Sequence, residues 1–456
     1  MNRRQFLRRT AGAAASLAFP TIIPASALGR DGRVAPSNRV AMGFIGLGGQ
    51  GTRNLQQFVQ IPEVQIVALC DVDHGVGQYN NLYQFPGSAD AGRSPAKTRA
   101  VQWLADAGRP TAANDIAEYA DFRELLARPD IDAVTVCTPD HWHGLISIHA
   151  AKSGKDIYCE KPLVNSIPEG RAVCDAVRRH GRVLQTGSHE RSNDTVRYTC
   201  ELVRNGRIGK LHTMRVNMPN TDPHHLKLLE NRGPKPTMPV PEGFDYEMWL
   251  GPAEWAPYTQ ERTHFWWRYI LATGGGEITD RGAHIIDLGQ FVNDCDDSGP
   301  VELSAKGRTL GNGLFDSFIT YDFEATYANG VKMFGGSEGQ RGIKFEGDKG
   351  WIFVHIHGGR LEASSPDLLR EKIGPSEFHT PRSPGHHRDF IECVQSRRRP
   401  IAHEEIGHRT ATFCHLINIA LLTGRKIQWD PAAERITNDP NLHRLVAKPM
   451  RSPWRL

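Results

Sequence analysis

The sequence predicts an α/β protein in which a parallel-stranded N-terminal domain precedes a C-terminal α/β domain with an open, mainly antiparallel sheet. Three observations favour this fold. Apolar strand-like runs alternate with helical stretches before Ser166, a glycine-rich turn follows the first of these runs, and later runs alternate apolar and polar residues. With 456 residues, 39% hydrophobic and 23% charged, the chain is long enough for two domains with sizeable cores.

The first 34 residues have the pattern of an export signal and linker. The pair Arg3-Arg4 precedes a short region of small apolar residues and an Ala-Ser-Ala cleavage pattern that ends at Ala27. This resembles a twin-arginine signal, whose pathway carries folded proteins, and an ordinary Sec signal is the alternative. We therefore expect an exported, periplasmic protein that the twin-arginine machinery recognises.

Composition excludes several classes of partner. The net charge of +4 lies partly in the first nine residues, so the remainder is close to neutral and gives no case for nucleic acid or a membrane surface. No later stretch approaches the roughly 18 apolar residues of a membrane span. The eight cysteines show no CxxC or Cys/His ligand spacing, so we expect no metal site. Those inside apolar runs are interpreted as small buried hydrophobic residues.

A glycine-rich turn follows the first predicted strand. Three glycines have the spacing G-x-G-x-x-G between an apolar run and a helical stretch, and a second apolar run leads to an acid about twenty residues on. This is the pattern of a Rossmann dinucleotide-binding domain, in which the glycines let a pyrophosphate approach a helix N-terminus. The predicted cofactor contacts in the turn are Gly46, Gly48, Gly49, Gln50 and Gly51.

Asp71, at the end of the second apolar run, determines the predicted cofactor. Its carboxylate would accept hydrogen bonds from the adenosine ribose hydroxyls and would repel a 2′-phosphate, so NAD is favoured over NADP. The alternative is a glycine-rich turn with a solvent-facing aspartate.

Two further predicted strands, "AVTVC" and "DIYC", end beside the same crevice, because ligands of a parallel sheet gather at the carboxyl ends of its strands. Lys161 is the least expected residue there, since an unpaired ammonium is costly to bury, and its position indicates that something needs its charge. For His143, helix capping and packing is the alternative to binding. The cofactor contacts predicted at these ends are Thr138, Pro139, His143, Glu160 and Lys161.

The pattern changes after residue 165. The runs "LHTMRVNM", "SFITYDFEATYANGVKMF" and "GIKFEGDKGWIFVHI" alternate apolar and polar residues and are typical of antiparallel strands, whereas 219–257 is a long irregular insertion. Two helical stretches follow from His386. We therefore expect a signal and linker at 1–34, a Rossmann domain at 35–165 and a substrate and oligomerisation domain at 166–456, with terminal helices able to pack back on the Rossmann domain.

Several motifs together resemble the Gfo/Idh/MocA oxidoreductases, a family named for glucose–fructose oxidoreductase, inositol dehydrogenase and a rhizopine-catabolism protein. The motifs are "GFIGLGGQG", "ALCDVD", "TPDHWH", "CEKPL", "GSHERS", "GRIGKL" and "GGGEITDRGAHIIDL", with "YEMWLGP" and "HHRDFIECV" further on. The resemblance implies a Rossmann domain, a C-terminal α/β domain whose sheet often forms an oligomer interface, and hydride transfer with a nicotinamide cofactor.

The resemblance also implies a catalytic set. In the sugar and polyol dehydrogenases of this family, the lysine of the E-K-P motif contacts substrate, and an aspartate and a histidine four residues apart complete the site; these correspond to Lys161, Asp280 and His284. An i, i+4 spacing places two side chains on one helix face. Lys161 would stabilise negative charge, His284 would accept a proton, and Asp280 would orient substrate or His284. The alternative for Lys161 is a surface ion pair, and the alternative for Asp280 is helix capping.

Four further residues are candidates for substrate binding. His189 and Arg191 in "GSHERS" could bind sugar hydroxyls, and Trp266 and Trp267 could stack on a sugar ring. Aromatic clusters are more often part of a core, which is the alternative for the tryptophans.

Three functions remain open at this point. The first is an NAD(P)-dependent oxidoreductase acting on a hydroxyl of a sugar, glycoside or cyclitol, with tightly bound cofactor because dissolved NAD is a cytoplasmic metabolite. The second is a glycosidase that oxidises C3 transiently and releases the aglycone by elimination. The third is a non-catalytic protein that binds NAD and a sugar. The expected assembly is a homo-oligomer formed through the C-terminal sheet.

Overall fold

The computed structural model describes residues 34–75, 91–221, 223–230, 232–311, 313–357 and 359–456. The predicted export signal lies almost wholly in residues 1–33, outside the described residues. The chain divides into two units, residues 1–39 and 40–456. The described part of the first unit contains the short 3₁₀ helix η2 (Pro36–Asn38), and the second unit contains both sheets.

The first sheet has six strands in the order β3-β2-β1-β4-β5-β6, all paired in parallel. This order, in which the chain turns back beside β1, confirms the predicted Rossmann-like domain. The sheet continues through β6, beyond residue 165 where the sequence placed the boundary. Its strands are β1 (Val40–Ile45), β2 (Val64–Cys70), β3 (Ala117–Tyr119), β4 (Ala133–Val136), β5 (Asp156–Cys159) and β6 (Leu184–Thr186).

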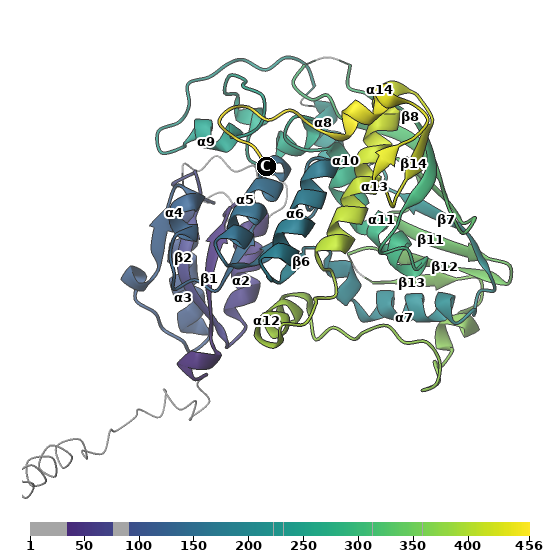
Figure 1. The fold of residues 1–456 in the computed structure, drawn as a ribbon, viewed down its shortest axis with the longest axis horizontal. Coiled ribbons are helices and arrows are strands. Elements are labelled where there is room, and N and C mark those ends of the chain that lie inside the picture. Colours follow the sequence, from purple (N-terminus) through teal and green to yellow (C-terminus); the bar gives the residue numbers. More distant parts are fainter. Residues whose placement is uncertain (1–33, 76–90, 222, 231, 312, 358) are drawn as a thin grey trace, which may run out of the picture. The chain divides into compact units, whose positions relative to one another are not determined.

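Helices connect these strands, as parallel pairing requires. They are α2 (Gly49–Val59), α3 (Arg93–Asp106), α4 (Phe122–Leu126), α5 (Asp140–Lys152) and α6 (Ile167–Arg179). β1 and β2 are buried at all positions but one, and β4, β5 and β6 at every position, which explains their apolar runs, whereas the edge strand β3 is half-buried. Figure 1 shows α5 and α6 side by side next to this sheet.

The second sheet has nine strands in the order β13-β12-β11-β7-β10-β9-β8-β14-β15. Among its described strands, β7 and β10 pair in parallel and the other neighbours are antiparallel, so the sheet is mainly antiparallel as predicted. The strands are β7 (Leu211–Asn217), β8 (Pro300–Thr309), β9 (Phe318–Tyr327), β10 (Lys332–Gly336), β11 (Gly342–Gly347), β12 (Gly350–His355), β13 (Leu361–Ala363), β14 (Ile427–Asp430) and β15 (Arg435–Ile436).

Three helices pack on one face of the second sheet: α7 (Asp194–Arg204), α11 (Arg281–Val292) and α13 (Glu404–Thr423). Nearly every residue of α11 and α13 is buried, and their apolar side chains form one core with those of the strands. In Figure 1, α13 lies between this sheet and α6, so it contacts both domains.

A helix near the C-terminus packs on the Rossmann domain. This helix, α12 (His386–Ser396), places Phe390 with its ring centroid 6.1 Å from that of Phe58 and 5.9 Å from that of Tyr158. The remaining helices are α8 (Pro223–Glu230), α9 (Tyr246–Leu250), α10 (Gly276–Thr279) and α14 (Pro440–His443), with 3₁₀ turns η4 (Ala113–Asp115), η5 (His189–Ser192), η6 (Gln260–Arg262), η7 (Trp266–Tyr269), η8 (Pro366–Arg370) and η9 (Arg444–Val446).

All eight cysteines lie in the described residues and are unpaired thiols. Six are buried, and Cys137 and Cys295 are half-buried. Their interpretation as small hydrophobic residues agrees with this placement. None of the described helices combines the length and the apolar character that a membrane crossing requires.

Candidate functional site

A cavity of about 900 Å³ lies at the carboxyl ends of the Rossmann strands. Its wall includes Gly46 after β1, Asp71 after β2, Thr138 after β4 and Lys161 after β5, which are the four strand ends that the sequence predicted to meet. The opposite part of the wall comes from the C-terminal domain. It contributes Trp267, Arg268, Asp280, His284 and His357.

The glycine turn leaves room for a ligand backbone at the start of α2. Gly46 has φ +84°, and a Cβ there would lie 2.6 Å from the carbonyl carbon and oxygen of Cys137. Gly48 caps α2 without a side-chain hydrogen bond from the described residues, so the first N–H groups of the helix can bind a pyrophosphate. Gly49 and Gln50 line the cavity as well. Gly51 is not among the described residues that line the cavity. A Cβ at Gly51 would overlap the backbone oxygen of Gly46, so this glycine allows close packing of the helix on the strand.

Asp71 is held in place by two backbone N–H groups. Its Oδ2 accepts from Leu47 at 2.5 Å and its Oδ1 accepts from Asp73 at 2.8 Å. Burial raises the pKa of Asp71 to about 6, against the opposing effect of these two hydrogen bonds. A ribose hydroxyl can donate to the remaining lone pairs of this carboxylate.

The turn after β4 presents a buried hydroxyl to the cavity. Thr138 Oγ1 is buried and has no hydrogen-bond partner among the described residues. Both ring nitrogens of His143 lie near backbone carbonyls, Nδ1 2.7 Å from Pro162 and Nε2 2.8 Å from Thr138. The imidazole therefore joins this turn to the Lys161-Pro162 turn. Pro139 is the N-cap residue of α5.

Glu160 connects α2 to the lysine beside it. Its Oε1 accepts from Asn54 Nδ2 at 2.8 Å and from Gln50 Nε2 at 3.1 Å, and its Oε2 accepts from the backbone N–H of Lys161 at 3.3 Å. Glu160 and Gln50, both predicted to bind the cofactor, line the cavity and are hydrogen-bonded to each other.

Lys161 and Asp280 form an ion pair across the cavity. Lys161 Nζ lies 2.5 Å from Asp280 Oδ1 and 3.3 Å from the Asp280 backbone oxygen, and Arg268 Nε lies 3.5 Å from the same Oδ1. Burial alone would lower the pKa of Lys161, but the charge of Asp280 and its hydrogen bond raise it above the ordinary value. Lys161 therefore remains an ammonium.

Asp280 does not lie within a helix, contrary to the geometry expected from the i, i+4 spacing. It is the junction residue between α10 and α11, with φ −84° and ψ −89°, and makes no side-chain cap to the described residues of α11. His284 is in the first turn of α11, so both side chains still reach the cavity. The Asp280 carboxylate therefore pairs with Lys161 and does not cap the described part of α11.

His284 lies in a group of imidazoles. It is 5% exposed, and its ring centroid is 4.6 Å from that of His189 and 5.2 Å from that of His357. Its Nδ1 is buried without a hydrogen-bond partner in the described part of the chain. Burial, followed by the neighbouring His189 and Lys161, lowers the pKa of His284 well below its ordinary value. The ring is therefore neutral and able to accept a proton.

Two of the residues predicted to contact substrate, Arg191 and Trp266, are not among the described residues that line the cavity. Arg191 is 2% exposed and its guanidinium is fully used by Asp287, at 2.7 and 2.9 Å, and Asp296, at 2.6 and 2.8 Å. Trp266 is 3% exposed and packs in an aromatic cluster with Phe265 and Phe315. Neither belongs to the described residues that line the cavity, because ion pairing and core packing use these side chains.

The other two candidates do line the cavity. Trp267 lies beneath the guanidinium of Arg268, 4.3 Å from the ring centroid, and His189 is the more exposed member of the imidazole group. Sequence reasoning missed Glu190 and His357, which also line the cavity. Glu190 adjoins His189 in "GSHERS", which was a usable signal. His357 lies in a turn after β12 and has no local motif.

Family comparison decides the classification. Residues 40–188 match the description "Oxidoreductase family, NAD-binding Rossmann fold", and residues 192–456 match "Oxidoreductase family, C-terminal alpha/beta domain". This chain belongs to the Gfo/Idh/MocA oxidoreductase family. Its cofactor is NAD, and the glycine cradle, the Asp71 carboxylate and the buried Thr138 hydroxyl fit a dinucleotide.

The curated relatives of this Gfo/Idh/MocA chain include proteins named as an oxidoreductase and as a glycosidase. It is 27% identical over 298 residues to the uncharacterized oxidoreductase YrbE of Bacillus subtilis (strain 168), covering 65% of this chain and 66% of YrbE. It is 27% identical over 223 residues to an alpha-N-acetylgalactosaminidase of Shewanella oneidensis, covering 46% of this chain and 44% of the relative. The chain thus spans two thirds or less of these relatives.

A solved structure shows the same fold. The WlbA dehydrogenase from Bordetella pertussis, in complex with NADH and UDP-GlcNAcA, aligns with a TM-score of 0.59 and 16% identity. The alignment covers 86% of this Gfo/Idh/MocA chain and 99% of WlbA.

Proposed function

We propose that this protein is an NAD-dependent oxidoreductase that acts on a hydroxyl of a sugar, glycoside or cyclitol and retains its cofactor between turnovers. One observation carries the proposal: the Lys161–Asp280 ion pair and the neutral His284 line the same cavity as the dinucleotide cradle. A hydroxyl placed among these groups would be next to a cation, a proton acceptor and a hydride acceptor.

Each group has a defined task in the oxidation of an alcohol to a ketone. Bound NAD supplies the hydride acceptor. The substrate C–H electron pair leaves as hydride, and the O–H proton passes to the His284 imidazole, so that a C=O bond forms. Negative charge on the oxygen in the transition state is stabilised by the Lys161 ammonium, which Asp280 orients through their 2.5 Å contact.

A second candidate is a glycosidase that works by transient oxidation at C3. The observation that favours it is the similarity to an alpha-N-acetylgalactosaminidase. Residues of the same cavity would assist removal of a hydride and a proton at C3, and the resulting ketone would acidify the neighbouring C–H bond. The aglycone would then leave by elimination. Addition of water and reduction of the ketone would restore the sugar. Net redox is zero.

One experiment separates the two candidates. Purified protein is incubated with a panel of glycosides, free sugars and cyclitols, and both NADH absorbance and aglycone release are followed. Absorbance without release supports the oxidoreductase, and release without added cofactor supports the glycosidase. Neither signal with any compound of the panel would contradict both.

The discrimination between NAD and NADP is assigned to Asp71. Replacement by alanine removes a ribose acceptor and the charge that repels a 2′-phosphate, so Asp71→Ala should weaken NAD binding about tenfold or more and narrow its preference over NADP. Titration of both dinucleotides, followed by protein fluorescence, checks this. Unchanged affinities for both would assign the discrimination to another residue.

Export is part of the proposal and rests on the Arg3-Arg4 signal pattern. A twin-arginine route would carry the folded protein with its dinucleotide already bound, and the mature protein would act in the periplasm as a homo-oligomer. Periplasmic protein is purified, sized by light scattering and denatured, and the supernatant is assayed for nucleotide. A substoichiometric trace, together with activity that depends wholly on added NAD, would contradict cofactor retention.

A further inference from the structure

The imidazole group in the cavity includes a carboxylate that sequence analysis did not single out. Glu190 is 3% exposed, and its Oε1 lies 3.1 Å from His357 Nδ1 and 3.7 Å from His189 Nε2. The three ligand-capable atoms all lie within 4.8 Å of one another. We call these residues, His189, Glu190 and His357, the cavity triad.

The spacing of the cavity triad suits one ion. Ligand atoms about 2.0–2.2 Å from a tetrahedral Zn²⁺ are separated by about 3.3 Å, close to the two distances from Glu190. Two imidazoles and one carboxylate are a typical three-ligand set for a zinc ion that keeps one position open. The small adjustment needed is available because His189 is 44% exposed.

The charge of the triad also favours a cation. Glu190 Oε1 accepts a hydrogen bond from the backbone N–H of His357 at 2.9 Å and lies beside the imidazoles of His357 and His189. Two cationic side chains of this region already have anionic partners, Lys161 with Asp280 and Arg191 with Asp287 and Asp296. In the described part of the chain, the ion-pair contacts of the Glu190 carboxylate are with His189 and His357 and not with a guanidinium or an ammonium.

An independent observation comes from His284. Its buried Nδ1 has no partner within the described residues, although the ring lies directly against His189 and His357. A buried ring nitrogen without a hydrogen bond is costly, so a hydrogen-bonding group bound beside it would be stabilising. An oxygen atom carried by an ion at the triad would lie beside this imidazole and could supply that hydrogen bond.

We propose that His189, Glu190 and His357 bind one divalent transition-metal ion of the zinc type, with an open position that faces the cavity. The open position takes a water molecule or a hydroxyl oxygen of the substrate, and the ion polarises that O–H bond next to His284. Metal binding is independent of the proposed function. The assignment of the polarised oxygen to the substrate rests on that function.

The test is a metal titration of the untagged full-length protein with its cofactor. Protein stripped with a chelator is titrated with Co²⁺, followed by visible absorption, and with Zn²⁺, followed by calorimetry, and bound metal is counted by mass spectrometry. We expect one ion per chain with a dissociation constant of about 1 μM or below. Loss of one ligand should weaken binding by about 100-fold or more.

Two variants and a control make the result specific. His189→Asn and Glu190→Gln should both lose the tight site, and His189→Asn keeps the fold testable because this side chain is the most exposed of the three. Glu434→Gln, in a cluster outside the cavity, should bind metal like the parent, and circular dichroism confirms folding of each protein.

Absence of stoichiometric binding, or equal binding by His189→Asn and the parent, would overturn the metal site. Because the titration needs no substrate, its outcome is separate from that of the glycoside panel. A metal-free protein that oxidises a sugar at the rate of the metal-loaded one would overturn the role of the ion in substrate binding.

Discussion

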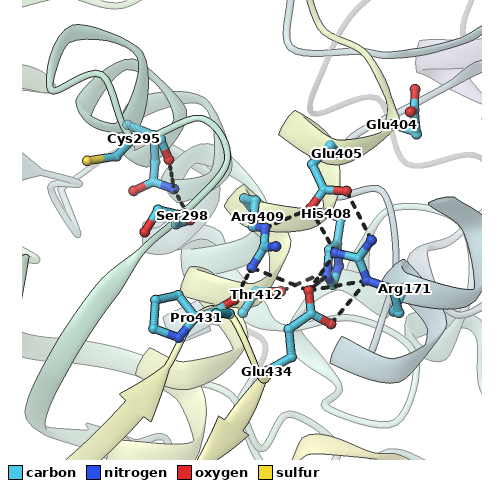
Figure 2. A network of polar contacts seen from close by, with 12 residues as sticks. Arg171, Cys295, Ser298, Glu404, Glu405, His408, Arg409, Thr412, Pro431 and Glu434 are labelled. Carbon is cyan, nitrogen blue, oxygen red and sulfur yellow. Dashed lines mark hydrogen bonds and ion pairs between the residues drawn. The ribbon is translucent and has the colours of Figure 1, made fainter. Parts of the chain in front are cut away.

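Two clusters of this protein both combine glutamate with histidine, but the side chains that surround their carboxylates differ in charge. In the cavity triad, Glu190 lies among imidazoles. The second cluster, Glu405, His408 and Glu434, lies where α6, α13 and the turn between β14 and β15 meet, and we call it the junction cluster. Figure 2 shows Arg171 and Arg409 contacting both of its carboxylates.

The junction cluster is saturated by guanidinium groups. Arg171 lies 2.7 Å from Glu405 and 2.5 Å from Glu434, Arg178 lies 2.5 Å from Glu405, and Arg409 lies 2.8 Å from Glu405. His408 Nε2 completes the network, 2.8 Å from Glu434. Three arginines around two carboxylates leave no need for a metal ion, so these bonds serve to hold three chain segments together.

The comparison teaches that residue type and proximity do not by themselves identify a functional cluster. Charge compensation and access distinguish the two clusters. Arginines of the protein itself neutralise the junction cluster, whereas the cavity triad faces a space of about 900 Å³ and its carboxylate has no guanidinium partner among the described residues. Substitutions in the cavity should therefore alter turnover with little effect on stability, and substitutions in the junction cluster should do the reverse.

The largest expected effect is on turnover in the cavity. His284→Asn removes the proton acceptor, and the rate of the oxidation identified by the glycoside panel should fall about 100- to 10,000-fold. The thermal midpoint should stay close to that of the parent. His408→Asn in the junction cluster is the matched control and should leave turnover nearly unchanged. Parental rates in His284→Asn would assign proton removal to another residue.

The second largest effect on turnover is expected for Lys161→Met. Loss of the ammonium removes stabilisation of the developing oxyanion and should lower kcat about 100- to 1,000-fold. Binding of NAD should change little, because the proposed dinucleotide contacts are made by the glycine turn and Asp71. Steady-state kinetics and a fluorescence titration measure the two quantities. A variant that lost NAD binding as well would show that Lys161 supports the cofactor rather than the reaction.

A junction substitution should act on stability instead. Glu405 is almost buried, and Glu405→Gln leaves Arg171, Arg178 and Arg409 with one carboxylate fewer. The free energy of unfolding should fall by about 2–3 kcal/mol, less than for a fully buried pair because the arginines are partly exposed. Urea unfolding measures this. Unchanged stability together with reduced turnover would contradict the assignment of the junction cluster to stability.

The smallest effect concerns acid stability. Burial alone would raise the pKa of Glu434, but hydrogen bonds from His408 and Arg171 lower it to about 2, with Arg409 also facing the carboxylate. Because its folded-state pKa lies below the unfolded value, Glu434 stabilises the protein fully above about pH 5 and progressively less towards pH 2.

The stability difference between the parent and Glu434→Gln should therefore shrink as the pH falls through this range. Urea midpoints of both proteins at several pH values between 7 and 3 check it, and comparing the pair removes contributions from other titrating groups. A difference independent of pH would show that the carboxylate charge is not what stabilises the junction.

The parts of the site that lie on the Rossmann strands could be predicted from the sequence. Gly46, Asp71 and Lys161 each follow an apolar run, and parallel pairing brings the carboxyl ends of such runs to one edge. Local sequence thus contains the signal, because the fold converts each strand end into a position in the same crevice.

The C-terminal side of the site could not be predicted in this way. His357 meets Glu190 across 167 residues, and its position depends on how β12 pairs in a nine-stranded sheet. Arg191 looked like a substrate contact because its partners Asp287 and Asp296, 96 and 105 residues away, are not visible in its own motif. Long-range partners decide whether a polar side chain is available.

The Glu160 carboxylate connects the dinucleotide-binding helix to the turn that contains Lys161. It accepts hydrogen bonds from Asn54 and Gln50 of the dinucleotide-binding helix with one oxygen and from the backbone of Lys161 with the other. A dinucleotide bound at the start of this helix would therefore be connected through Glu160 to the backbone of Lys161. If a bound dinucleotide tightens a ligand at Lys161, thermodynamic linkage requires that ligand to tighten the dinucleotide by the same factor. Such coupling would appear as a lower dissociation constant for each ligand in the presence of the other.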